Sequence, residues 1–190
     1  MAASEVSICN LALSRVGHDE ITALAEDTKA GRLCNLNYAM MRDAVLRDHF
    51  WNFAIKRVTL AASVTTPVYE FGYAYPLPAD FLRLVRASSD WLQTCSPYRI
   101  ENGNILTDDN DFSIEYVYQC TDTGLFDSQF VDVLAQRLAA EICVGLTDNA
   151  NMAANLWQVY REKMAAAQAN DSMEGTTRSF AADTWLNSRY

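Results

Sequence analysis

The stretch Tyr73–Leu84, "YAYPLPADFLRL", decides how the middle of this 190-residue chain folds. Alternating aromatic residues precede two prolines, and a dense apolar run follows them. Because proline holds the preceding residue in an extended conformation, Tyr75 and Leu77 end one strand. Pro78 suits the first position of a single helical turn, with Asp80 near its positive end, and a second strand follows. The stretch therefore predicts a structural corner, and it holds no residue placed like a nucleophile or a base.

Strand-like patterns surround this corner from residue 53 to residue 120. The segments "FAIKRVTLA", "FLRLVRA" and "FSIEYVYQC" mix or alternate apolar and polar residues, as strands do. Four aromatic residues at every second position share one face of a predicted strand: Tyr69, Phe71, Tyr73 and Tyr75. Asn102 and Gly103 between two short apolar runs give the strongest hairpin signal in the chain. We expect a central antiparallel sheet of four to six strands.

Helical periodicity flanks the strand region on both sides. The predicted helices span residues 4–16, 28–49, 127–147 and 149–174. Candidate N-caps are Ser4, Asp27 or Thr28, and Asp127 or Ser128, and Gly17 follows the end of the first helix. The short link between the last two helices predicts antiparallel neighbours. This segregated order predicts an α+β fold: an antiparallel helix bundle with a β-sheet insertion, forming one domain over residues 1–174.

The last sixteen residues, 175–190, contain no periodic element and are expected to form an extended C-terminal tail. Large apolar side chains stand in this otherwise polar segment: Phe180, Trp185, Leu186 and Tyr190. A tail with such residues usually docks on a neighbouring surface. We therefore predict that these four residues bind a partner.

The net charge of −9 is concentrated in the middle of the chain. Residues 61–126 carry three basic and nine acidic side chains. Such a surface disfavours sequence-specific DNA binding, which needs a basic footprint, and suits a wall past which DNA slides. Charges interrupt every apolar run, so no membrane span is expected, and the N-terminus does not resemble a secretory signal.

Five cysteines occur at wide spacings: Cys9, Cys34, Cys95, Cys120 and Cys143. No C-x-x-C pair or Cys/His cluster is present, so we expect no metal and predict buried free thiols in a reducing cytoplasm. The "DDND" run at 108–111 lacks the glycine and glutamate of a calcium loop and is expected to be a solvated loop.

The sequence contains no common catalytic or cofactor-binding motif. Its two histidines, His18 and His49, lack a nucleophile–base pattern and are expected to be structural, with His49 packed against Trp51. No catalytic, cofactor-binding or metal-binding residue is therefore predicted. Three arginines, Arg83, Arg86 and Arg99, suggest a small basic patch that is better suited to salt bridges with a partner than to phosphate.

Several segments in order resemble one family. They are "ICNLALSRVGHDEITAL", "FWNFAIKRVTLA", "YAYPLPADFLRLV", "YRIENGNILT" and the paired C-terminal helices. This set, from about Ile8 to about Gly175, resembles the tail tubular protein A family of short-tailed bacteriophages, which are adaptors of the head–tail connector. The residues that match the connector after the first helix are Val16, Gly17, Ile21 and Leu24. Trp51 and Phe53 match the W-x-F pattern after the second helix.

The resemblance implies a structural virion protein without enzymatic activity. Family members form a ring, understood to be dodecameric, between the portal and the tail nozzle or tube, and they line the channel through which double-stranded DNA leaves. The implied partners are copies of this chain, the portal protein, the nozzle or tube protein, and DNA that passes without sequence recognition. The implied location is the head–tail junction of the virion, after assembly in the host cytoplasm.

Two alternatives from other functional classes remain open. One is an enzyme with a dispersed site, for example a hydrolase that uses His49 and a distant carboxylate. The other is a non-viral interaction module. For the adaptor, we expect the isolated protein to be monomeric, because a ring contact that forms only on the portal avoids premature assembly.

Overall fold

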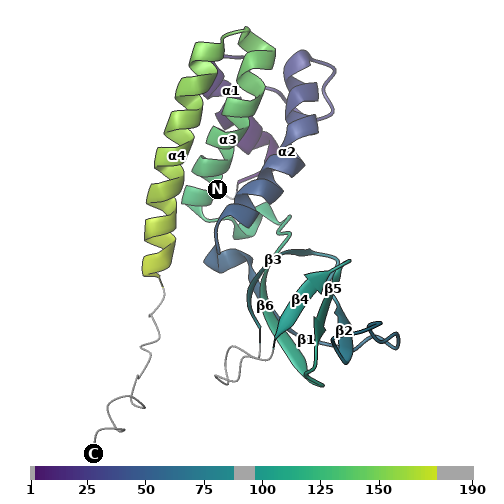
Figure 1. The fold of residues 1–190 in the computed structure, drawn as a ribbon. Coiled ribbons are helices and arrows are strands. Elements are labelled where there is room, and N and C mark those ends of the chain that lie inside the picture. Colours follow the sequence, from purple (N-terminus) through teal and green to yellow (C-terminus); the bar gives the residue numbers. More distant parts are fainter. Residues whose placement is uncertain (1–2, 88–96, 175–190) are drawn as a thin grey trace, which may run out of the picture.

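Helices and strands occupy separate parts of the computed structural model, which describes residues 3–87 and 97–174 (Figure 1). The described helices are α1 (Glu5–Val16), α2 (Lys29–Asp48), α3 (Ser128–Thr147) and α4 (Ala150–Met173). The described strands are β1 (Ile55–Leu60), β2 (Tyr73–Pro76), β3 (Phe81–Ala87), β4 (Tyr98–Glu101), β5 (Asn104–Thr107) and β6 (Phe112–Tyr118). The 3-10 turns η1 (Asn52–Ala54) and η3 (Thr123–Leu125) join the helical part to the β part. The predicted α+β class is confirmed.

Local capping explains where the helices begin and end. The Ser4 hydroxyl accepts a hydrogen bond from the Ser7 amide, and the Ser7 hydroxyl accepts one from the Ser4 amide. Gly17 then ends α1 in the left-handed conformation, at φ 74°. Of the alternatives left open by the sequence, Thr28 caps α2 and Asp127 caps α3. The predicted helix limits lie within a residue or two of the observed ones.

Helix α3 lies at the centre of the helical part, where it contacts α1, α2 and α4. Gln136 on α3 donates to the Leu156 carbonyl of α4 at 3.0 Å, and Gln129 near the start of α3 accepts from Asn170 near the end of α4. These pairings run in opposite directions along the two helices, so α3 and α4 are antiparallel. None of the described helices is long and apolar enough to cross a lipid bilayer.

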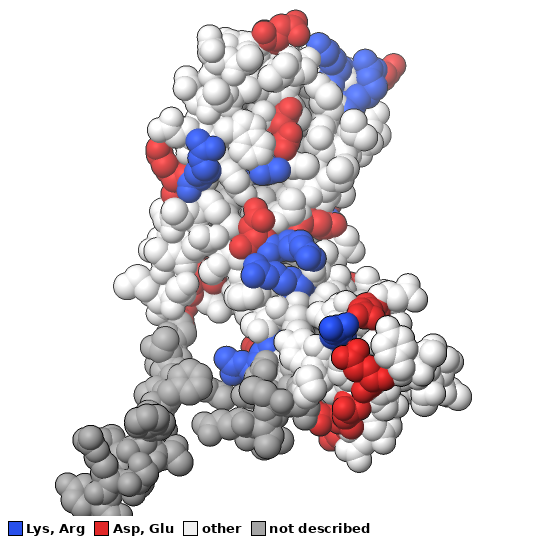
Figure 2. Space-filling model, viewed as in Figure 1, with Lys and Arg blue, Asp and Glu red and all other residues white. Residues whose placement is uncertain are grey.

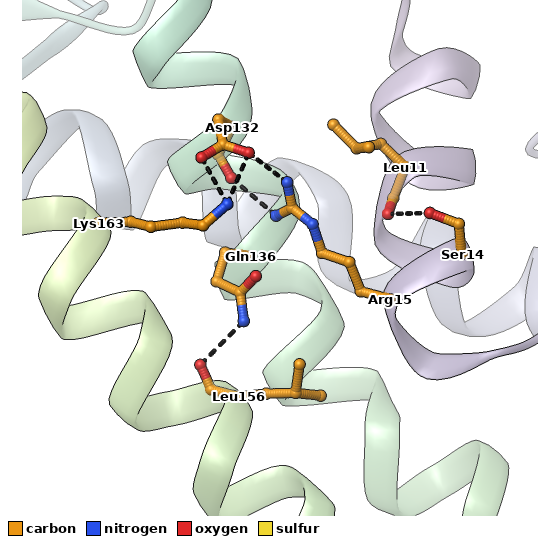
Figure 3. A network of polar contacts seen from close by, with 7 residues as sticks. All are labelled: Leu11, Ser14, Arg15, Asp132, Gln136, Leu156 and Lys163. Atoms are coloured by element: carbon orange, nitrogen blue, oxygen red, sulfur yellow. Dashed lines mark hydrogen bonds and ion pairs between the residues drawn. The ribbon is translucent and has the colours of Figure 1, made fainter.

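A polar network ties three helices together around Asp132 (Figure 3). Arg15 of α1 forms an ion pair with the Asp132 carboxylate of α3 and donates to the Asp132 carbonyl at 2.8 Å. Lys163 of α4 reaches both carboxylate oxygens, at 2.6 and 2.8 Å. Burial raises the pKa of Asp132, but Lys163 and Arg15 outweigh it and hold that pKa below its ordinary value. The network fixes α1 and α4 relative to α3.

The cysteines of the described segments are buried and unpaired, as predicted. They are Cys9, Cys34, Cys120 and Cys143. Cys95 lies outside the described residues. The four buried thiols behave as small apolar side chains in the helical core.

The strands form two three-stranded antiparallel sheets instead of the single sheet that we expected. The first has the order β1-β6-β3, and the second has the order β2-β5-β4. The corner between β2 and β3 separates them: β2 pairs with β5, whereas β3 pairs with β6. Between the sheets lies a second apolar cluster, which contains Tyr75, Ala87, Ile105, Phe112, Ile114 and Tyr116.

The corner is a single hydrogen-bonded turn that begins at Pro78, where the sequence predicts one helical turn, and it does not continue into a helix. The Phe81 amide donates to the Pro78 carbonyl at 3.0 Å, which closes a four-residue turn. Asp80 then links this turn to β1 and to the end of β6. Its carboxylate accepts from the Lys56 ammonium at 2.8 Å and from the Tyr116 hydroxyl at 2.9 Å, and its carbonyl accepts from the Gln119 amide at 2.7 Å.

The predicted alternation of aromatic residues holds only in part. Tyr73 begins β2, but Tyr69 and Phe71 belong to the preceding loop. Glu70 between them adopts φ 73°, which interrupts an extended strand. The hairpin prediction is confirmed: Asn102 and Gly103 join β4 to β5 with φ 48° and φ 72°.

Candidate functional site

An aromatic cluster forms the joint between the helical part and the β part. Trp51 is fully buried, and its indole nitrogen donates to the Val45 carbonyl at 2.9 Å. Its ring meets Phe130 of α3 edge to face, at a centroid distance of 5.2 Å. His49 packs edge to face against Trp51 at 5.0 Å, as predicted. The "HFWNF" segment therefore anchors the end of α2 on the core just before the sheet begins.

Asp171 attaches the end of α4 to this same joint. Its carboxylate lies 2.9 Å from His49 Nε2 and accepts a hydrogen bond from the Asn52 amide at 3.2 Å. The Asn52 side chain donates to the Asp171 carbonyl at 2.8 Å. These contacts place the last turn of α4, after which residues 175–190 continue the chain, beside the start of β1.

The His49–Asp171 pair is the arrangement closest to catalytic machinery in the described residues. A carboxylate that orients an imidazole is one part of a nucleophilic triad. In residues 3–87 and 97–174, no serine, threonine or cysteine side chain is hydrogen-bonded to His49. No group of three potential ligands in these same residues is arranged to hold a metal ion. The contacts that His49 and Asp171 make are those of a structural clamp between the end of α4 and the joint.

A groove lies between the outer face of the second sheet and the loop before β2. Side chains alternate across this sheet, so Tyr75 and Ile105 enter the apolar cluster while Ala74, Leu106 and Arg99 face the groove. The groove has a volume of about 340 Å³. Its other wall is the loop of residues 63–71. We call residues 63–72 the groove loop.

Hydrogen bonds hold the groove loop at both ends. The Ser63 amide donates to the Ala74 carbonyl of β2 at 2.7 Å. The Gly72 amide donates to the Asp108 carboxylate at 2.8 Å. Between these points the loop projects from the molecule beside β2 (Figure 1), and Val64, Val68 and Tyr69 are 101%, 98% and 79% exposed. Neighbouring apolar side chains that are exposed to solvent on an anchored loop are typical of contact surfaces.

Acidic side chains outnumber basic ones in the segments that form the groove, and Glu70 and Glu101 line it. Residues 61–76 and 97–111 together hold five acidic side chains and one basic side chain, Arg99. The Arg99 guanidinium lies 3.8 Å from the Glu70 carboxylate and 3.6 Å from the Glu101 carboxylate. Figure 2 shows acidic side chains gathered over the β part, whereas both signs are mixed over the helices. The groove therefore favours a positively charged partner.

Several residues singled out in the sequence have a different setting in the structure. Arg83 stands in the first sheet and stacks over the Phe50 ring, while Arg99 stands in the second sheet, so they do not form one basic patch. His18 is exposed after the end of α1. The predicted partner-binding residues all lie outside the described residues: Phe180, Trp185, Leu186 and Tyr190.

The sequence did not reveal the Asp171 clamp or the groove loop. Asp171 lies 122 residues from His49, so no local spacing links them. The sequence predicts part of the groove loop to be a strand, because Tyr69 and Phe71 continue the alternation of Tyr73 and Tyr75. A search with protein-family models and a search of curated proteins both found no match to this chain.

Proposed function

We propose that this protein is a head–tail connector adaptor of a short-tailed phage. It forms a ring between the portal and the tail nozzle or tube, and DNA passes through that ring without sequence recognition. One observation carries the proposal. The segments that resemble the tail tubular protein A family coincide with the parts that determine this fold: α1 and its connector, the aromatic joint, the corner and the β4–β5 hairpin.

The connector after α1 illustrates this correspondence. Asn10 of α1 both donates to the Ile21 carbonyl and accepts from the Ile21 amide, at 2.9 Å in each case. Ile21 and Val16 are buried, and Leu24 packs against the same core. Residues that match the family pattern here are those that fix the chain path. The resemblance is therefore consistent with a shared architecture and not only with a shared composition.

The charge distribution supports passage of DNA. The acidic β part would repel phosphate and so would not retain DNA that slides past it. The clamp at Asp171 supports the proposed role of the C-terminal tail. It gives residues 175–190 a fixed point of departure at the joint, from which Phe180, Trp185, Leu186 and Tyr190 reach a portal or a neighbouring copy.

Removal of the tail tests this function. We expect a chain truncated after Gly175 to keep its fold, because the described contacts lie before this residue, and to lose binding to the portal ring encoded by the same genome. Co-sedimentation with portal rings measures binding, and circular dichroism checks the fold. Unchanged binding by the truncated chain would refute the role of the tail. No binding by the full chain would favour a non-viral interaction module.

The His49–Asp171 pair supports a second candidate, a hydrolase with a dispersed site. His49→Gln removes the imidazole while the amide still donates to Asp171, so the clamp is retained. If the protein is an adaptor, we expect virions that carry this variant to assemble and to infect cells as well as virions with the natural protein. A loss of infectivity with normal assembly of the neck would instead favour the enzyme.

A further inference from the structure

The groove beside β2 has two features that identify what it binds. Its loop offers apolar side chains to solvent, and the Arg99 guanidinium of the floor lies between the carboxylate of Glu101 on β4 and that of Glu70 on the groove loop. Val64 and Val68 are almost fully exposed, and Glu70 is exposed although it lies near Arg99. A ligand of this groove has to match both features at once.

Glu70 and Glu101 retain the capacity to accept a second cation. Charge-assisted hydrogen bonds between a guanidinium and a carboxylate are about 2.7–2.9 Å long. The distances from Arg99 to these carboxylates, 3.8 and 3.6 Å, are longer. One positive charge therefore lies between two negative ones without a close contact to either. A further Lys or Arg from a partner balances this excess of negative charge.

The apolar side chains restrict the partner further. Val68 and Tyr69 immediately precede Glu70, so an apolar group and a cation of the partner are recognised next to each other. A groove of about 340 Å³ between a sheet face and a loop accommodates a few residues of extended chain. The fixed ends of the groove loop lower the ordering cost of such a contact.

We propose that this groove binds an extended segment of another protein, in which a Lys or Arg stands beside an apolar residue. The cation pairs with Glu70 and Glu101, and the apolar side chain packs on Val68 and Tyr69. The chemistry of the segment follows from the groove alone. Its assignment to the next component of the tail rests on the proposed function.

Other occupants fit the charges less well. An anionic lipid surface would be repelled by the five acidic side chains of residues 61–76 and 97–111. A second copy of this chain would have to offer a basic surface to the groove, whereas the chain carries a net charge of −9. A basic segment from a different protein is thus the favoured occupant.

Selection from a library of random short peptides tests the proposal on the full-length protein. We expect enriched sequences to combine Lys or Arg with an adjacent apolar residue. A synthetic peptide of the consensus sequence should bind Val68→Ser/Tyr69→Ser about tenfold more weakly. Binding should also weaken in Glu70→Gln/Glu101→Gln and with rising salt. The matched control is Leu36→Ser/Met40→Ser, which removes exposed apolar side chains from α2 and should leave binding unchanged.

Four outcomes overturn the proposal. The selection enriches no peptides, or the consensus peptide is acidic or uncharged. The α2 control weakens peptide binding as much as the groove variants do, or the groove variants do not weaken peptide binding. Binding to phosphatidylserine vesicles through Val68 and Tyr69 would assign the groove to a membrane. Self-association that these variants abolish would assign it to a second copy. Portal binding by the Glu70→Gln/Glu101→Gln variant is measured in parallel and should persist. If the natural protein itself does not bind the portal, the adaptor function is refuted, whereas the result of the peptide selection still holds.

Discussion

At the residue scale, Asp80 explains how a short turn holds the β part together. Its carboxylate joins β1 through Lys56 and β6 through Tyr116, and the Lys56 ammonium also lies 3.7 Å from the centre of the Tyr118 ring. Burial raises the pKa of Asp80, but hydrogen bonds from Lys56 and Tyr116 outweigh it and leave that pKa below its ordinary value. The charged form is therefore favoured in the folded protein.

We predict that Asp80→Asn destabilises the protein by about 1 kcal/mol at neutral pH, since it removes a partly exposed ion pair. A carboxyl whose pKa is lowered on folding stabilises the fold above its unfolded pKa, and this contribution is lost as the pH falls through the folded value. The difference between Asp80→Asn and the natural protein should therefore shrink below the ordinary pKa of 3.8. Urea unfolding at several pH values measures it. A difference that grows on acidification would contradict the assignment.

Gly103 is a second residue whose role follows from backbone geometry. Its φ is 72°, and a Cβ placed there meets no atom within 4 Å. We predict that Gly103→Ala costs about 1 kcal/mol from the left-handed conformation alone, without steric repulsion. Asn102→Gly is the matched control, because glycine adopts the φ of 48° at that position freely. Equal stability of Gly103→Ala and the natural protein, measured by thermal unfolding, would disprove this account.

At the scale of elements, the end of α4 is attached to the joint by Asp171 and to α3 by the hydrogen bond from Asn170 to Gln129. Asp171 contacts both His49 and Asn52 at the joint where β1 begins. The C-terminal turn of α4 has little other anchorage, because Ser172, Met173 and Glu174 are exposed. The position of Glu174, the last described residue of the chain, depends on this clamp.

We predict that Asp171→Ala releases the last turn of α4 while the rest of the fold persists. Amide hydrogen exchange should accelerate in residues 170–174, and the free energy of unfolding should fall by about 2 kcal/mol. Glu162→Ala is the control on the same helix, because its side chain is exposed and accepts a hydrogen bond from Gln158 of the same helix. Unchanged exchange at the end of α4 would show that other contacts hold it.

The elements that the sequence predicted well are those with local causes. Ser4 and Gly17 mark the ends of α1, and Asn102 with Gly103 marks the hairpin, because each signal resides in the backbone preference of adjacent residues. Strand pairing has no such local cause. The partner of β3 is β6, about thirty residues along the chain, and it could not be read from the alternation of either strand.

At the scale of the whole molecule, the β part has two faces with different uses. One face of the second sheet packs against the first sheet through Tyr75, Ile105 and Phe112. The other face forms the floor of the groove. The sequence predicted one sheet because the alternation of apolar positions identifies strands but does not show how the strands are divided between sheets. The groove lies on the outer face of the second sheet, so it could not be predicted without the division of the strands into two sheets.

The separation of a helical part from a β part fits an adaptor. The helical part, fixed by Asp132 and Trp51, supplies a rigid body, and the β part offers an acidic contact face. In the proposed ring, neighbouring copies pack through helices while the groove faces the next tail component. An isolated protein that light scattering finds to be monomeric would fit assembly on the portal template.

The central claim is that this chain forms a ring beneath a portal. Cryo-electron microscopy of the purified protein mixed with the portal ring encoded by the same genome tests it most directly. The adaptor account predicts a second ring below the portal, into whose density the helical and β parts fit with their described arrangement and with an open central channel. Portal rings that carry no additional density would contradict it.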